Sequence, residues 1–369
     1  MGQPASFSAG GTSPQAASEG GTSTPAAGQP VALSAFATTV GVVVIGRNEG
    51  ERLRRCLLSV QEQAGLVVYV DSGSTDGSPA TAAALRVEVV ELDPSIPFSA
   101  GRGRNAGLER LMELSSSLEF VLFVDGDCEV AKRFVEVGRQ SLVDDARIAA
   151  VAGRLRERFP ERSVYNRLCD MEWDVPPGDA KSCGGIALFR VSALRDVGGF
   201  NPRVVAGEEP ELCVRLRQRG WMIKRLPDDM ATHDAAMTRF SQWWKRAVRA
   251  GHAYAEGSAI HGRSPERHFV RESLSSWIYG IAMPAAILAA TVAISPWALV
   301  AAMVYPLLLV RVAVGRRRRH RDSWRLAFLY AGACLLAKPA ECWGQARYWF
   351  RRMLGRPPQI IQHKAVTRE

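Results

Sequence analysis

The sequence predicts an α/β domain with a mostly parallel, Rossmann-like sheet, followed by C-terminal hydrophobic helices. Short runs of β-branched residues alternate with helical segments between residues 39 and 257. Each run is apolar throughout, as in strands that are buried on both faces. Further along, the segment 277–314 carries a single charge, Arg311, and is much longer than the roughly 20 apolar residues that cross a bilayer.

The elements of the α/β domain follow in order. Strands are expected at 40–46, 66–71, 87–92 and 119–128, and helices at 48–63, 79–85 and 99–114. In the first helix the apolar positions Leu53, Cys56, Leu57 and Val60 have the spacing of one helix face. Strands that alternate with helices favour parallel pairing with right-handed crossovers. Ligands of such sheets bind beyond the carboxyl ends of the strands.

Polar residues follow three of the four strands at that edge. Asn48 and Glu49 come after the first strand, Asp71 ends the second, and Asp125 and Asp127 end the fourth. Hard cations such as Mn²⁺ or Mg²⁺ bind one or two carboxylates and leave other positions to water and phosphate oxygens. These residues therefore predict a site for a divalent cation and a phosphorylated ligand. The alternative is a set of ordinary polar turns.

Two further segments carry candidate site residues. Arg102 and Arg104 lie near the start of a helix, where free amides and positive charge favour anions. Glu208 and Glu209 stand together, and a carboxylate near a hydroxyl can remove its proton as a bond forms. The alternative for the glutamates is an amphipathic helix with an acidic first turn.

Six blocks in order resemble the family-2 glycosyltransferases of the GT-A fold, and they cover about residues 39–251. The blocks are "VVVIGRNEGERLRRCLLSV", "VYVDSGSTDGS", "GRGRNAGL", "FVDGDC", "GGIALFRVSALRDVGGF" and "GEEPELCVRLRQRGW". The resemblance implies an inverting, metal-dependent enzyme with a nucleotide-sugar donor, carrying either UDP or GDP.

The resemblance also implies roles for individual residues. Asp71 would lie beside the nucleobase or ribose, and Arg104 would contact the nucleotide. Asp125 and Asp127 would form the DxD pair, with Asp127 on the metal and Asp125 nearer the ribose and sugar, within reach of the same ion. His233 resembles the histidine that often supplies another metal ligand. Asn48 and Glu49 are assigned to the nucleotide-sugar side as well.

Glu209 matches the catalytic base of the family, which is usually the Asp of a Glu-Asp pair. This chain has Glu-Glu instead, so Glu208 remains a rival for the role. The chain also lacks the QxxRW arrangement of processive synthases, since Trp, Trp, Lys and Arg follow Gln242. This departure favours transfer of single sugars.

The two ends of the chain differ in composition and charge. Residues 1–38 are rich in Gly, Ser, Ala, Pro and Thr, and we expect a disordered tail. Residues 258–369 are expected to form a membrane-associated hairpin and a basic tail. The segment 277–314 is interrupted by Ser295-Pro296, and either spans the bilayer twice or forms a re-entrant pair. Residues 326–337 are too short for a third span, and the aromatic and basic segment that follows suits an interfacial helix.

Charge and cysteine usage predict where the protein acts. The formal net charge is +10, and residues 241–369 carry the excess of Lys and Arg. The basic segment 315–321 follows the apolar one, and the positive-inside rule places it at the cytoplasmic face of the inner membrane. The seven cysteines form no CxxC pair, which suits a reducing cytosol. The apolar segment favours a membrane partner over a nucleic acid.

We therefore expect a membrane-anchored glycosyltransferase whose acceptor is lipid-linked or a glycan precursor. Two alternatives belong to other classes. A nucleotidyltransferase of similar fold would also use carboxylates and a metal but would release pyrophosphate. A non-catalytic nucleotide-sugar sensor would bind the donor and turn nothing over, and it would not need a base such as Glu208 or Glu209.

Overall fold

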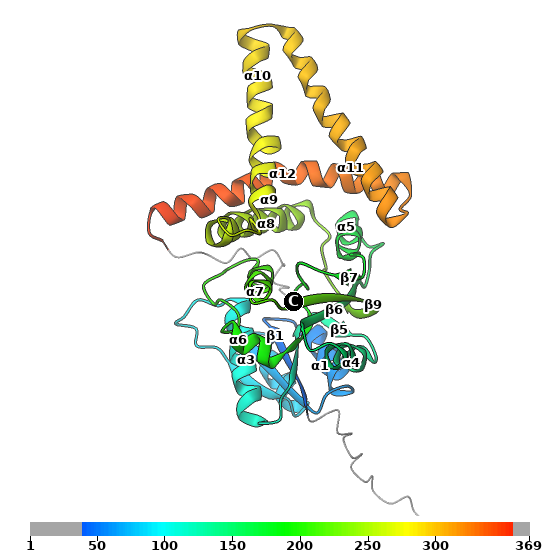
Figure 1. Ribbon diagram of the computed structural model, residues 1–369, viewed down its shortest axis with the longest axis vertical. Coiled ribbons are helices and arrows are strands. Elements are labelled where there is room, and N and C mark those ends of the chain that lie inside the picture. Colours follow the sequence, from blue (N-terminus) through cyan, green and yellow to red (C-terminus); the bar gives the residue numbers. More distant parts are fainter. Residues whose placement is uncertain (1–38, 357–369) are drawn as a thin grey trace, which may run out of the picture. The chain divides into compact units, whose positions relative to one another are not determined.

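The computed structural model describes residues 39–356, which all lie in the compact unit Leu33–Glu369 (Figure 1). The tail expected at residues 1–38 lies outside the described part of the chain, as does the end of the basic tail from residue 357. The strands form one sheet in the order β3-β2-β1-β4-β8-β6-β9-β5, with β7 beside β9. Their bounds are β1 (Val40–Gly46), β2 (Leu66–Asp71), β3 (Glu88–Glu91), β4 (Phe120–Asp125), β5 (Cys128–Val130), β6 (Ile148–Glu157), β7 (Gly178–Asp179), β8 (Ala187–Arg190) and β9 (Met222–His233).

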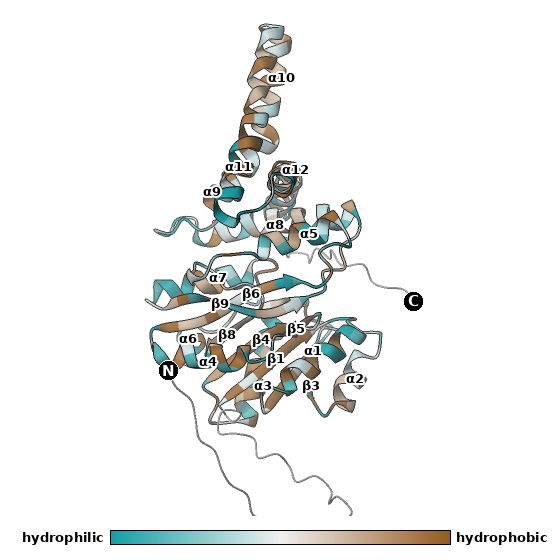
Figure 2. Ribbon diagram, turned by 90° about the vertical axis from the view of Figure 1, so that its right-hand side faces the viewer, coloured by the Kyte–Doolittle hydropathy of each residue, from teal (hydrophilic) through white to brown (hydrophobic). Residues whose placement is uncertain are grey.

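The first half of the sheet is parallel, as the sequence predicts. β1 pairs with β2 on one side and with β4 on the other, and β2 pairs with β3. The apolar runs of β1, β2 and β4 are buried, and the hydrophobic colour of β1 and β4 is visible in Figure 2. Because the three strands run the same way, Gly46, Asp71 and Asp125 end at one edge of the sheet.

The second half makes the sheet mixed. β8 is antiparallel to both β4 and β6, while β9 is parallel to β6 and antiparallel to β5 and β7. The predicted α/β class is confirmed, with parallel pairing concentrated in the first four strands. The pairing of β5 with β9 places Cys128 directly opposite His233. A histidine far along the chain thus reaches the loop that follows β4.

Helices pack around this sheet and are joined by the loops that carry the polar residues. Their bounds are α1 (Glu51–Gln61), α2 (Ser78–Ala84), α3 (Ala100–Leu114), α4 (Phe134–Asp144), α5 (Val164–Trp173), α6 (Val191–Asp196), α7 (Glu208–Gln218) and α8 (Phe240–His261). The predicted apolar face of α1 is confirmed, because Leu53, Cys56, Leu57 and Val60 are all buried. In α3, Gly107 packs so close to β1 that an added Cβ would lie 2.3 Å from a Val43 methyl carbon.

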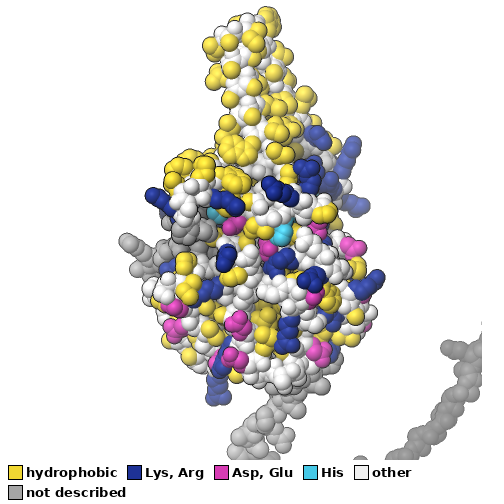
Figure 3. Space-filling view, turned by 60° about the vertical axis from the view of Figure 1, so that its left-hand side comes forward, with side chains coloured by type: hydrophobic (Ala, Val, Ile, Leu, Met, Phe, Trp, Pro, Cys, Tyr) yellow, Lys and Arg dark blue, Asp and Glu magenta, His cyan; other side chains and the backbone are white. Residues whose placement is uncertain are grey.

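The predicted C-terminal hydrophobic helices are present. One runs through α9 (Val270–Trp277), a π-helical turn (Ile278–Ala282) and α10 (Met283–Ala293), and the other through a 3₁₀ segment (Pro296–Met303) and α11 (Val304–His320). Both are long and apolar enough to cross a membrane by length and composition, which alone is weak evidence of a span. They separate at Ser295, whose side chain accepts a hydrogen bond from the Trp297 amide. Figure 3 shows hydrophobic side chains over this hairpin and Lys and Arg near its base.

The last helix, α12 (Trp324–Met353), is continuous. It contains both the apolar segment 326–337 and the aromatic and basic segment that follows it, which the sequence predicts as separate elements. It crosses α8 in close contact. A Cβ added to Gly344 would lie 2.0 Å from the Val248 carbonyl oxygen, and one added to Gly251 would lie 2.0 Å from the Glu341 carbonyl oxygen. The two backbones therefore touch at each of these glycines.

Candidate active site

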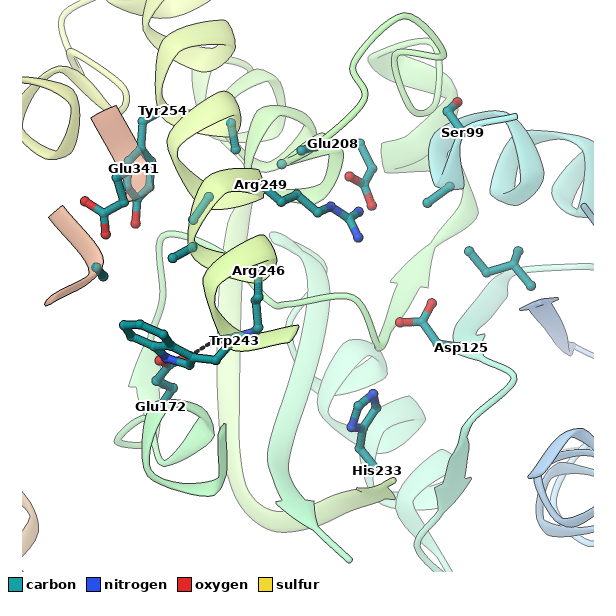
Figure 4. Close-up of a pocket in the computed structure, with 18 of the residues that line it drawn as sticks. Ser99, Asp125, Glu172, Glu208, His233, Trp243, Arg246, Arg249, Tyr254 and Glu341 are labelled. Carbon is teal, nitrogen blue, oxygen red and sulfur yellow. Dashed lines mark hydrogen bonds and ion pairs between the residues drawn. The ribbon is translucent and has the colours of Figure 1, made fainter. Parts of the chain in front are cut away.

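A cavity of about 870 Å³ lies between the carboxyl ends of the parallel strands and the pair α8 and α12 (Figure 4). Its lower wall comes from the loop after β1, the end of β4 and the start of α7. Its upper wall comes from one face of α8 and one face of α12. The residues that line it and carry chemistry are Asn48, Glu49, Arg104, Asp125, Glu172, Glu208, His233, Arg246, Arg249, Lys338 and Glu341.

Arg104 ties three segments of the lower wall together. Its side chain is 2% exposed, and α3 carries it into the floor of the cavity. Nη1 donates to Glu208 Oε1 at 2.7 Å, while Nη2 donates to Asp125 Oδ1 at 3.0 Å and to the Gly185 carbonyl oxygen at 3.1 Å. A buried cation needs such partners to offset its lost hydration. The nucleotide contact that the resemblance implies for Arg104 stays a prediction.

The two aspartates after β4 occupy different environments. Asp125 lines the cavity and its side chain is 37% exposed. Asp127 is buried, and His233 Nε2 lies 3.1 Å from its Oδ2. On its other side, the His233 ring faces Glu157, whose Oε2 is 3.8 Å from Nδ1. Sequence reasoning missed Glu157, which has no motif around it and reaches the histidine only through the pairing of β6 with β9.

The donor atoms around Asp127 fit a divalent cation. The ligand atoms of Asp127, Cys128 and His233 all lie within 4.8 Å of one another. Carboxylate oxygen and imidazole nitrogen suit Mn²⁺, and carboxylate oxygen suits Mg²⁺, whereas a thiol suits softer ions. Asp127 and His233 are therefore the fitting ligands, and the Cys128 thiol lies 3.6 Å from the Asp127 carboxylate as a weak donor.

Glu208 and Glu209 also point to different places. Glu208 lines the cavity. Burial raises its pKa, but the charges of Arg104 and Arg249 outweigh burial, so the pKa lies below the ordinary value. Glu209 is not among the cavity residues. Its Oε1 accepts hydrogen bonds from the Cys183 amide at 2.6 Å and from the thiols of Cys183 and Cys213, and burial raises its pKa.

Of the residues predicted to bind the nucleotide on the β1 and β2 side, two line the cavity and one does not. Asn48 and Glu49 line the cavity, and Asn48 Oδ1 accepts the Thr75 amide at 2.7 Å. Asp71 does not line it. The Asp71 carboxylate is buried and accepts hydrogen bonds from Tyr69 and Ser74 and from the Gly73 amide. Asp71 thus orders the loop after β2, while its neighbour Ser72 reaches the cavity.

The upper wall adds charged residues that sequence blocks do not identify. Arg246 is paired with Glu172 of α5, and Lys338 is paired with Glu341 within α12. Arg249 has no hydrogen bond or ion pair with any residue between 39 and 356, and its guanidinium points toward Glu208 in Figure 4. Along α8, aromatic and basic residues alternate from Trp243 to Arg249, and this pattern is the signal in the sequence that could have indicated Arg249. Nothing in the sequence predicts that α12 forms part of the same cavity.

The N-terminal part of the sheet domain matches a known protein family. Residues 41–198 match the family described as "Glycosyl transferase family 2". This range begins within β1 and continues through β8. It includes Asp71, Arg104, Asp125 and Asp127, but ends before Glu208 and His233.

One curated relative and one solved structure extend the comparison. The pre-mycofactocin glycosyltransferase of Mycobacterium tuberculosis is 29% identical over 242 residues, which are 60% of this chain and 48% of that protein. The chain thus spans about half the length of this relative. The mannosyltransferase PcManGT of Pyrobaculum calidifontis, solved with GDP-Man and Mn²⁺, is 21% identical with a TM-score of 0.54, over 81% of this chain and 85% of that one. This likeness identifies the GT-A fold.

Replacing Arg104 with Met removes the cation that compensates the buried Glu208. We expect the free energy of unfolding to fall by about 3–5 kcal/mol, because an uncompensated charge remains in the interior. Urea denaturation of the full chain in detergent measures the change.

Arg110→Met is the matched control on the same helix. Arg110 pairs with Glu88 and Glu113 at the surface, and surface pairs contribute about 1 kcal/mol or less. Equal losses in the two variants would contradict a special role for Arg104.

Proposed function

We propose, because residues 41–198 match glycosyl transferase family 2, that the chain transfers a sugar from a nucleotide-sugar donor to an acceptor hydroxyl, with inversion at the anomeric carbon. The observation that carries the proposal is the cavity in which Asp125, Glu208 and His233 converge from β4, α7 and β9. Carboxylates, an imidazole and an arginine without an ion-pair partner in the described part of the chain suit a sugar linked to a diphosphate.

The donor side of the cavity is proposed to lie along the strand ends. Asn48 and Glu49 stand beside Asp125 there, and they suit the hydroxyl groups of a ribose or sugar. Arg249 faces the same space from α8 and has no partner within residues 39–356, so its guanidinium is available to phosphate oxygens. The donor is a UDP- or GDP-sugar in this proposal, and PcManGT, solved with GDP-Man, has the same fold.

Asp127 and His233, with Asp125 on the cavity side, are proposed to hold Mn²⁺ or Mg²⁺. The bound cation would supply positive charge that stabilises the departing nucleoside diphosphate. Glu157 would orient the His233 ring from its other side, as carboxylates commonly do behind metal-binding histidines. The Mn²⁺ of the PcManGT complex supports the choice of ion.

Glu208 is our candidate for the general base, in place of the Glu209 that the family pattern implies. Its lowered pKa keeps it a carboxylate at neutral pH, and it faces the cavity. In a single displacement, Glu208 accepts the proton of the acceptor hydroxyl as the oxygen bonds to the anomeric carbon. The bond between that carbon and the diphosphate breaks on the opposite face, so the configuration inverts.

The acceptor is proposed to enter beside α8 and α12, from the cytoplasmic face of the inner membrane. α12 lines the cavity with Tyr330, Cys334 and Lys338, and carries Leu336, Trp343 and Phe350 exposed on another face. Trp residues and exposed apolar faces favour the membrane interface. The adjacent hairpin and the exposed Arg317–Arg319 segment favour an anionic membrane surface. These features support a lipid-linked acceptor or a glycan precursor held at the membrane.

Asp127→Ala removes the proposed metal ligand. We expect the Mn²⁺-dependent part of nucleoside diphosphate binding to be lost, because Asp127 and His233 would hold the cation and its charge would attract the diphosphate. Isothermal titration of GDP and UDP, with Mn²⁺ and with EDTA, measures it. The control is Asp228→Ala, an exposed carboxylate on β9. An unchanged dependence on Mn²⁺ in Asp127→Ala would place the ion elsewhere.

Glu208→Gln removes the proposed base and nearly preserves shape. We expect transfer to slow by about 10²–10⁴-fold while nucleotide binding persists. Glu209→Gln is the comparison variant. It should keep the larger share of activity, because Glu209 bonds to the interior and not to the cavity. The reverse result would restore Glu209 as the base.

The proposed function is tested by incubating the chain with a panel of UDP- and GDP-sugars and Mn²⁺ and identifying the released product by its mass. Release of a nucleoside diphosphate would support glycosyl transfer. Pyrophosphate would indicate a nucleotidyltransferase instead. Donor binding without any product, with acceptors of both the lipid and the glycan class present, would favour a sensor.

Leu288→Asp with Val292→Asp places two charges on the exposed face of α10. Val292 is 80% exposed in the fold, and each charge at the centre of a span costs about 2.5–3.5 kcal/mol. We expect the variant to leave the membrane pellet after an alkaline wash that retains the parent chain. Val143→Asp, an exposed apolar position on α4, should stay with the pellet. Equal retention of both variants would contradict insertion of the hairpin.

A further inference from the structure

A second group of ligand-type side chains lies outside the cavity, behind the start of α7. It consists of Cys183, Glu209 and Cys213, which are all buried. Glu209 and Cys213 are four residues apart on α7 and so share a helix face. Cys183 reaches them from the segment between β7 and β8. Helix and loop thus present two thiols and one carboxylate to a single point.

The distances within this group approach those of a tetrahedral metal centre. The two Sγ atoms are 3.8 Å apart, and the Glu209 Oε1 atom is 3.0 Å from Cys183 Sγ and 2.9 Å from Cys213 Sγ. Zinc binds thiolate sulfur at about 2.3 Å and carboxylate oxygen at about 2.0–2.2 Å, which gives tetrahedral edges of about 3.8 Å between sulfurs and about 3.5 Å from sulfur to oxygen. The two sulfur atoms already have this spacing. On binding a metal, the Glu209 Oε1 atom would move about half an ångström away from them.

The surrounding charge suits a bound dication. Arg225 on β9 is buried, and its Nη2 donates to the Cys183 carbonyl oxygen at 3.2 Å. Its Nε atom has no hydrogen-bond partner among residues 39–356. Two thiolates, one carboxylate and one divalent ion sum to a single negative charge, which the Arg225 guanidinium balances. A buried charge needs this kind of compensation.

We propose that Cys183, Glu209 and Cys213 bind a thiophilic divalent cation of the zinc class, at a site separate from the Asp127 site. Thiolate ligands select soft ions, whereas the carboxylate and imidazole at Asp127 suit Mn²⁺. Binding replaces one proton on each thiol, and both protons pass to solvent. The site requires no glycosyl transfer, so it stands or falls independently of the proposed function.

Occupancy of this site would stabilise the start of α7. Glu209 lies in the first turn of the helix and adjoins Glu208, which faces the cavity. A cation held by residues 209 and 213 links that turn to the loop carrying Cys183. A ligand that binds only the folded state raises stability by mass action. Metal loading would therefore raise the melting temperature as well as change the spectrum.

Cobalt(II) is the probe, added to the reduced full chain in detergent. We expect absorption bands from thiolate-to-cobalt charge transfer that saturate at one cobalt per chain and disappear on addition of zinc. Cys213→Ser and Cys183→Ser should each abolish or strongly weaken the bands. Asp127→Ala should retain them, since that substitution affects the other site. Cys169→Ser, a buried cysteine on α5, is the matched control and should also retain them.

Proton release from the parent chain provides a second measurement that needs no variant to fold. Two protons per cobalt in weakly buffered solution support thiolate ligation. No charge-transfer band in the parent chain would overturn the proposal. So would bands that survive in both cysteine variants, or bands lost in Asp127→Ala, which would move the cobalt to Asp127, Cys128 and His233.

Discussion

The lower wall of the cavity depends on the hydrogen bonds and ion pairs of the Arg104 guanidinium. It joins the end of β4, the loop before β8 and the first turn of α7, and these three segments are distant in sequence. In the protein interior an arginine keeps its charge, and hydration must be replaced by fixed partners. The positions of Asp125 and Glu208 thus follow from one buried cation. Two carboxylates beside one space would repel each other without it.

Both acidic pairs divide into one residue that faces the cavity and one that faces the interior. Between β4 and β5 the chain turns at Gly126, so Asp125 ends one strand and Asp127 precedes the other. On α7, neighbouring side chains point about 100° apart, so Glu208 and Glu209 cannot serve the same space. The interior members take different partners: Asp127 meets His233, and Glu209 meets two thiols.

Local patterns in the sequence predict the strands at 40–46 and 66–71 well, because an apolar run buried on both faces has few alternatives. The family resemblance assigns His233 and Asp127 to the same metal, and the two side chains do lie 3.1 Å apart. Which of Glu208 and Glu209 faces the cavity depends on where α7 begins. Gly207, with a positive φ of 81°, sets this starting point. The antiparallel strand β8 and the wall formed by α12 depend on long-range packing, which no local pattern encodes. Asp71 is the opposite case, because its hydrogen-bond partners Tyr69, Gly73 and Ser74 lie within three residues of it, as in the ordinary polar turn that the sequence leaves open as the alternative.

The contact between α8 and α12 has a mechanical consequence. At Gly251 and Gly344 the two backbones meet without side chains between them, so neither helix can slide or rotate without the other. α8 carries Arg246 and Arg249 on the cavity, and α12 carries the exposed stripe of Leu336, Trp343 and Phe350. A displacement of α12 at this exposed stripe would therefore move α8, and with it Arg246 and Arg249, as one rigid unit. A displacement of α12 would therefore also change the distance between these arginines and the carboxylates of the lower wall.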